Sequence, residues 1–178
     1  MPGVGHWTSG YSRSELDEAQ ERYRLRFPPD LVELLLDRRP VRGYAWHTED
    51  HRIREMLEWP FELLRFDVEH GLWWGDWGEC PATAAERTEV LRSALRGASR
   101  LIPLIGHRFL PETPGEAGNP VFSMHGFDTI YYGADLADFF RRQFCPERSP
   151  REPVRRNVRH IPFWSDVVEK PDRLCYPK

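Results

Sequence analysis

The apolar positions in the first half of the chain recur at helical spacing. This spacing predicts helices from Ser14 to about residue 26, over 31–38, over 49–58 and over 84–96. Ser14, with Asp17 three residues later, forms an approximate capping box for the first of these helices, and Thr83 with Glu86 caps the fourth. Pro60 is expected to end the third helix, because proline cannot donate a helical hydrogen bond. The pattern of residues 61–68 is ambiguous.

Beyond residue 100 the pattern changes to short, apolar, β-rich runs. We expect strands at 101–105, 120–124 and 129–132, with residues 125–128 as a hairpin loop between the last two. Pro103 places the first strand at a sheet edge, since proline cannot complete the hydrogen-bond ladder. A last helix is expected over 135–144. Helices followed by strands predict an α+β fold: a single domain with an antiparallel sheet flanked by helices.

The two ends of the chain differ from this central domain. Residues 1–13 are interpreted as a loose N-terminal arm, with the alternative that Trp7 and Tyr11 fold back onto the domain. Residues 14–145 are interpreted as the α+β domain. Residues 146–178 form a basic strap whose first half is rich in proline and arginine. Within it, residues 161–164 read Ile-Pro-Phe-Trp and are too apolar to leave in water, so we expect the strap to dock onto the domain through them.

Composition narrows the class of protein. The net charge of −3 argues against a general affinity for nucleic acid or for an anionic membrane. No run approaches the roughly 20 apolar residues that a membrane span requires. Cys80, Cys145 and Cys175 are odd in number and far apart, which is typical of reduced thiols. These features indicate a cytoplasmic protein whose nucleic-acid binding is unlikely and which does not enter membranes.

The run at residues 101–111, LIPLIGHRFLP, carries a family resemblance. It resembles the signature of a bacterial branch of the SUKH superfamily. The segments Gly118–Ser123, Ile130–Gly133, Leu136–Phe140 and Phe163-Trp164 match that branch as well. The likeness extends from about Leu16 to Trp164, and its central run is the specific part.

The resemblance implies a function as well as a fold. Characterised SUKH members are mostly immunity proteins that neutralise toxins, often nucleases, and fungal relatives are regulatory scaffolds in cell-wall signalling. The family has an antiparallel sheet flanked by helices and brings no catalytic residues with it. We therefore expect a non-catalytic module of the immunity or scaffold type, without a cofactor, that binds a protein partner such as a toxin. The oligomeric state is left open.

Two groups of residues are candidates for the binding surface. Trp73, Trp74 and Trp77 lie with Asp76 in a glycine-marked loop, and tryptophan is enriched at binding hot spots. Tryptophan rings in a loop also often cover a hydrophobic core, so we expect two of the three to be buried and one to be exposed. The other candidates are His107 and Arg108, directly after an apolar strand, and His125 and Asp128 in the hairpin loop.

Arg108 has two interpretations. With His107 it would grip a carboxylate or phosphate on a ligand. Alternatively it would form a buried ion pair with Asp76, Asp128 or Glu112, which we favour because a buried arginine normally needs a partner. The alternative function is a small-ligand binder or an enzyme. Its pocket would lie near His107, Arg108, Asp128 and the three tryptophans.

Catalytic and metal sites find little support in the sequence. His47 and His51 are one helical turn apart, but no third ligand follows at a suitable spacing. Ser123 lies within an expected strand and not in a G-x-S-x-G turn, and glycine-rich phosphate loops are absent. The sequence therefore predicts no catalytic residue and no metal.

Overall fold

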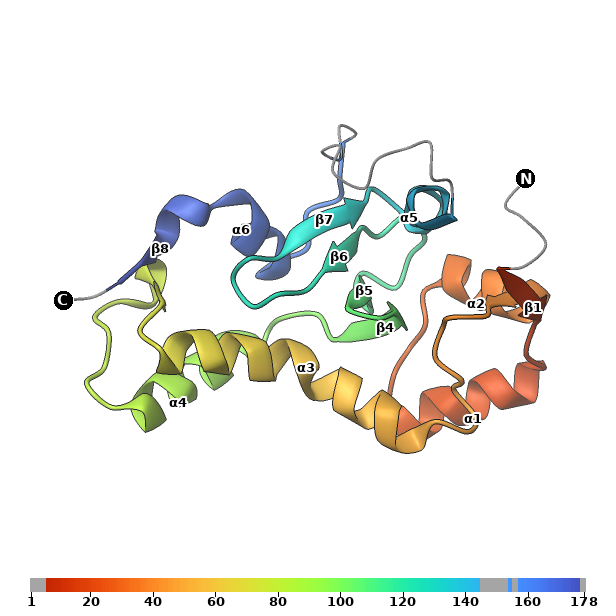
Figure 1. Cartoon of the computed structure of the whole chain (residues 1–178), viewed down its shortest axis with the longest axis horizontal. Helices are drawn as coiled ribbons and strands as arrows, with labels where there is room; N and C mark the ends of the chain where they lie inside the picture. Colours follow the sequence, from red (N-terminus) through yellow and green to blue (C-terminus); the bar gives the residue numbers. More distant parts are fainter. Residues whose placement is uncertain (1–5, 145–153, 155–156, 177–178) are drawn as a thin grey trace.

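A four-stranded antiparallel sheet lies at the centre of the molecule (Figure 1). The structure is a computed structural model that describes residues 6–144, 154 and 157–176. The strands follow one another across the sheet in chain order. They are β4 (Leu101–Ile105), β5 (Arg108–Pro111), β6 (Val121–Ser123) and β7 (Ile130–Gly133). The expected α+β class and the antiparallel pairing of the two hairpin strands are both confirmed.

Strand β5 is the part of the sheet that the sequence did not predict. His107 and Arg108 were expected to leave the sheet after β4. Instead Gly106, with φ +53°, allows a tight turn, and the chain returns antiparallel to β4 with Arg108 opposite Ile105. Beyond it, Phe109 pairs with Phe122 of β6, so β5 joins β4 to the hairpin.

Both faces of the sheet are buried, because alternate residues of its strands enter two different cores. One face contributes to a first core, and its residues are Ile102, Leu104, Leu110, Val121 and Tyr132. The other face contributes to a second core, and its residues are Leu101, Phe109, Phe122 and Met124, with Tyr131 packed against them. The helices therefore cover the sheet on both sides.

Three helices pack into the first core: α1 (Arg13–Tyr23), α2 (Pro29–Asp37) and α5 (Leu136–Phe144). The second core is covered by α4 (Ala84–Leu95) and α6 (Trp164–Glu169). Thr83 and Glu86 form the capping box of α4 as predicted, each accepting a backbone N–H from the other. Two short 3₁₀ turns, Gly75–Trp77 and Pro171–Arg173, complete the helical segments.

Helix α3 (Asp50–Glu69) is longer than the sequence predicted. Pro60 was expected to end it but lies inside it, where its ring is buried. The missing N–H costs about 3 kcal/mol in an isolated helix. Packing offsets that cost, because Ile53 is buried in the first core and Leu64 in the second, one on each side of the proline.

Residues 6–12, which the sequence placed in a loose arm, lie against the domain. Strand β1 (Trp7–Ser9) pairs antiparallel with β2 (Arg38–Pro40), and the Tyr11 N–H donates to the Leu35 carbonyl over 2.8 Å. The first helix is capped by Ser12 and Glu15, not by Ser14 and Asp17, and so begins at Arg13. Residues 1–5 lie outside the described part of the chain.

The described part of the strap also packs onto the domain. Ile161 is fully buried in the second core, and the Trp164 indole donates to the Ser99 carbonyl over 2.7 Å. Near the end, β8 (Leu174–Cys175) pairs antiparallel with β3 (Trp73–Trp74). Residues 145–153 and 155–156, which include most of the arginines of the strap, lie outside the described residues. In the described part, none of the helices is both long and apolar enough to cross a bilayer.

Candidate functional site

The three tryptophans of the predicted surface loop are mostly internal. Trp73 and Trp74 are 1% and 6% exposed, and strand β3 fixes them against β8. Trp77 is partly exposed and meets Trp73 edge to face, with 5.3 Å between the ring centroids. The rings therefore serve mainly to close the second core, and Trp77 alone of the three presents appreciable surface.

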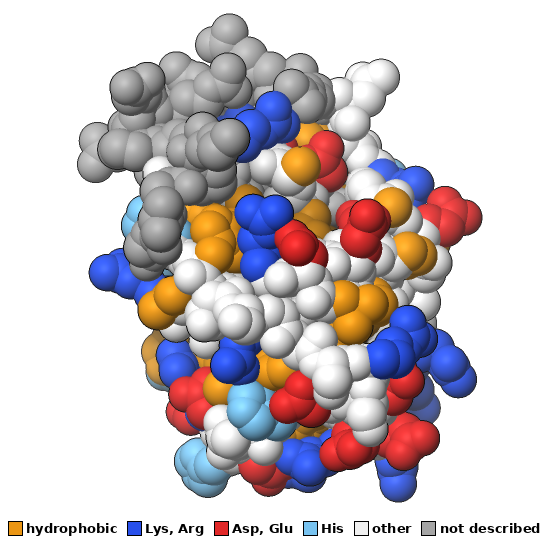
Figure 2. All heavy atoms as spheres, turned by 90° about the vertical axis from the view of Figure 1, so that its right-hand side faces the viewer, with side chains coloured by type: hydrophobic (Ala, Val, Ile, Leu, Met, Phe, Trp, Pro, Cys, Tyr) orange, Lys and Arg blue, Asp and Glu red, His pale blue; other side chains and the backbone are white. Residues whose placement is uncertain are grey.

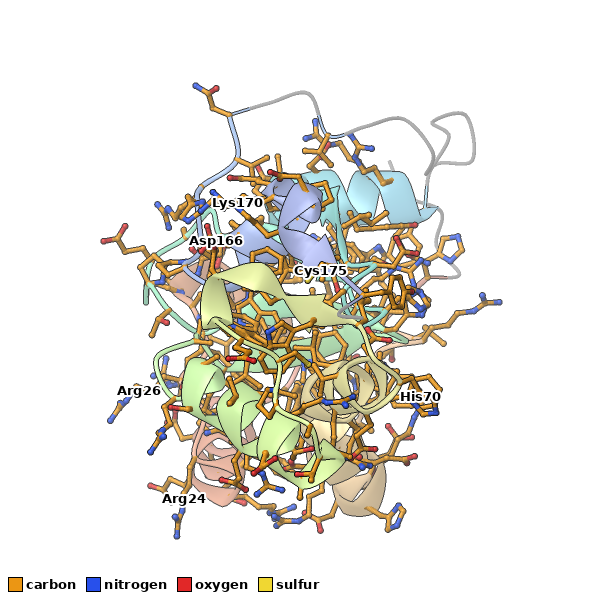
Figure 3. All side chains as sticks on the ribbon, turned by 90° about the vertical axis from the view of Figure 1, so that its left-hand side faces the viewer. Arg24, Arg26, His70, Asp166, Lys170 and Cys175 are labelled. Carbon is orange, nitrogen blue, oxygen red and sulfur yellow. The ribbon has the colours of Figure 1, made fainter. Side chains whose placement is uncertain are left out.

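Trp74 and Trp77 line a pocket of about 410 Å³ together with α6. Phe163 lies across from Trp77, nearly parallel to it, with 6.4 Å between centroids. The charged residues at this pocket are neutralised locally: Asp76 pairs with Arg173 at 3.1 Å and Asp166 with Lys170 at 2.6 Å. Figure 3 shows Asp166 and Lys170 next to each other at this end of the molecule, above Cys175. The pocket thus has aromatic walls and few free charges.

The hairpin loop at residues 125–128 is anchored to α3. The Asp67 carboxylate accepts the Phe127 N–H over 2.8 Å, and burial raises the pKa of Asp67. Gly126 has φ +63° and lies so close to Asp67 that a Cβ would be 2.0 Å from Oδ2. Phe127 is buried and stacks on Trp74, while His125 and Asp128 point to solvent. The loop therefore holds His125 in a fixed place on the surface.

His107, Arg108 and His125 form one cluster at the end of the sheet. The β4–β5 turn carries His107, whose ring centroid lies 4.3 Å from that of His125. The Arg108 guanidinium contacts His107 Nε2 through Nη1, and its Cζ lies 4.4 Å above the Tyr132 ring. All three residues are candidates from the sequence, and the structure brings them together. Asp128 forms no ion pair with them in the described part of the chain.

The ion pair that the sequence favoured for Arg108 is not formed. Asp76 pairs with Arg173, and Glu112 accepts the backbone N–H of Arg26 at 2.5 Å. The reason is the unpredicted strand β5, which places Arg108 on the first-core face, beside the ring of Tyr132. Among the residues described, Arg108 is therefore held by an aromatic ring and a histidine and not by a carboxylate.

His107 is held in its neutral form. Burial lowers its pKa from 6.5 to about 4, and the positive charges of Arg108 and His125 add to the effect. A neutral ring agrees with the geometry, because the Arg108 Nη1 group can only donate, so His107 Nε2 must accept. The proton of the neutral ring then lies on Nδ1.

This shift has a consequence for stability at low pH. In the unfolded chain His107 takes up its proton near pH 6.5, but in the folded chain only near pH 4. Falling pH therefore favours the unfolded state over that interval. After allowance for solvent screening we expect a loss of about 1–2 kcal/mol in the free energy of unfolding.

Urea titrations test this expectation. Between pH 7.5 and pH 4.5, the free energy of unfolding of His107→Asn should fall by less than that of the wild type. His47→Asn, at an exposed position, is the control, and equal losses in all three proteins would contradict the assignment.

A groove that the sequence did not predict lies between α2 and α5, with a volume of about 590 Å³. Its apolar lining consists of Trp7, Leu34, Leu136, Ala137 and Phe140. Its acidic lining consists of Asp30, Glu33, Asp37 and Asp135, and Arg38 is the one cation among the lining residues that the structure describes. Figure 2 views this end of the molecule and shows hydrophobic atoms exposed among acidic side chains.

The acidic side chains at the groove are held in different ways. Asp30 accepts the Gly118 N–H over 3.0 Å, and Asp135 accepts the Asp138 N–H over 2.6 Å, so both are fixed by backbone donors. Asp37 pairs with Arg38 at 2.6 Å. Glu33 is exposed and has no partner among the described residues. The spacing of residues 30, 33 and 37 along one helix face was the signal in the sequence that could have revealed this rim.

Comparisons of the chain with protein-family models, with curated proteins and with solved structures found no match. The site is therefore interpreted from its own chemistry. Among the residues that the structure describes, no three histidine, cysteine or carboxylate side chains are grouped as metal ligands. His47 and His51 are both exposed.

Proposed function

We propose that the chain is a non-catalytic protein-binding module that captures a basic, amphipathic segment of a partner protein in the groove between α2 and α5. The observation that carries this proposal is the combination of an apolar floor, formed by the apolar lining residues, with a rim that holds four carboxylates and one cation among the residues described. The floor would bury apolar side chains of the segment, and the rim would pair with lysines or arginines beside them.

The length of the rim favours a polypeptide over a single small cation. Asp30 and Asp37 are seven residues apart on α2, which corresponds to about 10 Å along the helix axis. Asp135 adds a carboxylate from the opposite wall, on the α5 side. Charges spread over this distance match several basic side chains along an extended or helical segment. Because such surface pairs each contribute about 0.2–1 kcal/mol, the apolar floor would supply most of the affinity.

The family resemblance supports the same class of function. A module of the immunity or scaffold type needs a recognition surface and no catalytic centre. A basic toxin such as a nuclease is the partner that an acidic rim would attract fastest, since opposite charges speed encounter. We propose the cytoplasm as its location, where Cys80 and Cys175 would stay as the free thiols found in the structure.

The groove can be tested with a synthetic probe of defined chemistry. The probe is a labelled amphipathic helical peptide with leucines on one face and lysines and arginines on the other. We expect saturable binding by fluorescence anisotropy, and weaker binding as salt is raised. Ala137→Arg fills the groove from an exposed position of α5, and Glu33→Lys reverses the charge of the unpaired rim residue. Ala137→Arg should weaken binding at least about tenfold, which corresponds to roughly 1.4 kcal/mol. Glu33→Lys should weaken binding several-fold, because an exposed ion pair contributes less than the apolar floor.

Two controls make the test specific. Ala84→Arg places the same side chain at an exposed position of α4, outside the groove, and should bind the peptide like the wild type. A second peptide, with glutamate in place of every lysine and arginine, should not bind. Equal binding of both peptides, or undiminished binding by Ala137→Arg, would show that the groove is not the recognition surface.

A further inference from the structure

We propose that Arg108 and the neighbouring His125 ring bind an oxyanion, a carboxylate or phosphate group, where the β4–β5 turn meets the 125–128 loop. This site is separate from the groove between α2 and α5: none of the groove's lining residues belongs to the cluster. The inference therefore stands or falls independently of the proposed function.

Arg108 differs from most other stacked arginines of this protein. Five further arginines lie over aromatic rings, and four of those five also pair with a carboxylate within 4.0 Å. The four pairs are Arg38 with Asp37, Arg52 with Glu49, Arg54 with Asp50 and Arg92 with Glu89. The fifth, Arg39, has no carboxylate within 4.0 Å among the described residues, although its charge adds slightly to the hydrogen bonds from Ser12 that lower the pKa of Glu15. Arg108 likewise has no carboxylate within 4.0 Å among the described residues, and Nε of both arginines is buried without an acceptor there. Arg108 differs from Arg39 in that its guanidinium contacts the histidine cluster.

The hydrogen-bonding groups of Arg108 are incompletely used. Nη1 donates to His107, and Nε is buried without an acceptor. Nη2 has no acceptor among the described residues either. A partly buried cation is costly unless an anion compensates for the water that it has lost. An oxyanion approaching the two terminal nitrogens of the guanidinium would supply that compensation with a charge-assisted hydrogen bond.

The neighbouring groups favour an anion over any other ligand. His107 accepts a hydrogen bond from the guanidinium and so orients it, and the guanidinium lies over the Tyr132 ring. The exposed ring of His125 contacts the His107 ring at a tilt of 60° and has no side-chain hydrogen-bond partner in the described part of the chain, which leaves a second donor at the same place. His107 is thus a positioning residue, and Arg108 and His125 are the groups that would touch the ligand.

Titration with simple anions tests the site directly. The whole chain, labelled with nitrogen-15, would be titrated with sodium phosphate, sodium acetate and sodium chloride at matched ionic strength. We expect saturable shifts of the Arg108 Nε–Hε signal and of the His125 ring proton with phosphate or acetate, but not with chloride. Saturation by phosphate alone assigns the site to a phosphate group, and saturation by acetate alone to a carboxylate. A separate titration with a glutamate-containing peptide tests whether the bound carboxylate belongs to a protein side chain or to a free anion. Equal shifts in all three salts would overturn the proposal.

Substitutions complete the test, with the His125 ring proton as the signal. Arg108→Met keeps the apolar stem on Tyr132 and removes the charge, and should weaken anion binding at least tenfold. Since no carboxylate is left unpaired, the variant should remain folded. Arg52→Met is the matched control, because Arg52 also stacks on a tyrosine but is paired with Glu49, and it should bind like the wild type.

If Arg108→Met does not fold, Arg108→Lys keeps the charge without the planar fork and should bind the anion several-fold more weakly than the wild type. Unchanged binding by either Arg108 variant would refute the site.

Discussion

Trp164→Ala is expected to lower the free energy of unfolding by about 3–5 kcal/mol, a large share of the total for a domain of this size. The ring is 4% exposed in the second core, and its indole N–H donates to the Ser99 carbonyl over 2.7 Å. The substitution would leave a cavity and an unpaired buried carbonyl beside β4. Urea unfolding followed by circular dichroism would measure the loss.

Two companion variants separate the causes. Trp164→Phe keeps most of the buried ring and removes the hydrogen bond, so it should lose less stability than Trp164→Ala. Tyr176→Ala alters a ring that is 75% exposed in the same C-terminal segment and should change stability by less than about 0.5 kcal/mol. A Trp164→Ala protein as stable as the wild type would mean that the strap is not part of the folded domain.

Gly10→Ala should be destabilising by about 3 kcal/mol or more, although it adds only one methyl group. A Cβ at this position would lie 2.1 Å from the Leu36 carbonyl oxygen and 2.8 Å from that of Leu35. Both atoms belong to the backbone of α2, so neither can turn away as a side chain would. The first strand would have to separate from α2, and thermal melts should show the loss directly.

Gly115→Ala is the matched control for this variant. A Cβ there would meet nothing within 4 Å, and its backbone conformation suits other residues. Its stability should therefore equal or slightly exceed that of the wild type, because alanine restricts the unfolded chain more than glycine does. If Gly10→Ala behaves like this control, residues 6–12 do not pack against the domain as described.

The sequence predicted the elements whose signals are local. The capping box at Thr83 and Glu86 and the β6–β7 hairpin depend on residues within a few positions of one another, and both were found. Strand β5 and the second half of α3 were missed, because tertiary contacts decide them. Pro60 is tolerated in α3 only because two cores hold the helix on either side of it. The chain after Gly106 turns back because β6 offers it a partner.

The candidate sites also divide into features with local sequence signals and features that tertiary contacts decide. His107, Arg108 and His125 were candidates because of their positions in the chain, but the ion pair expected for Arg108 was wrong, since the face on which it lies depends on β5. The groove was missed entirely because its walls come from segments about 100 residues apart, around Glu33 and Asp135. A stripe of carboxylates on a short helix becomes a recognisable rim only when the opposite wall is known.

The division into two cores also bears on the order in which the protein can fold during synthesis. Every buried member of the first core lies between Tyr11 and Phe140. The second core needs Ile161, Trp164 and Val167 as well. On the ribosome the first core can therefore close while the second still exposes Trp73 and Phe122. Until the strap has emerged from the ribosome, the nascent chain should bind chaperones that recognise exposed aromatic surface.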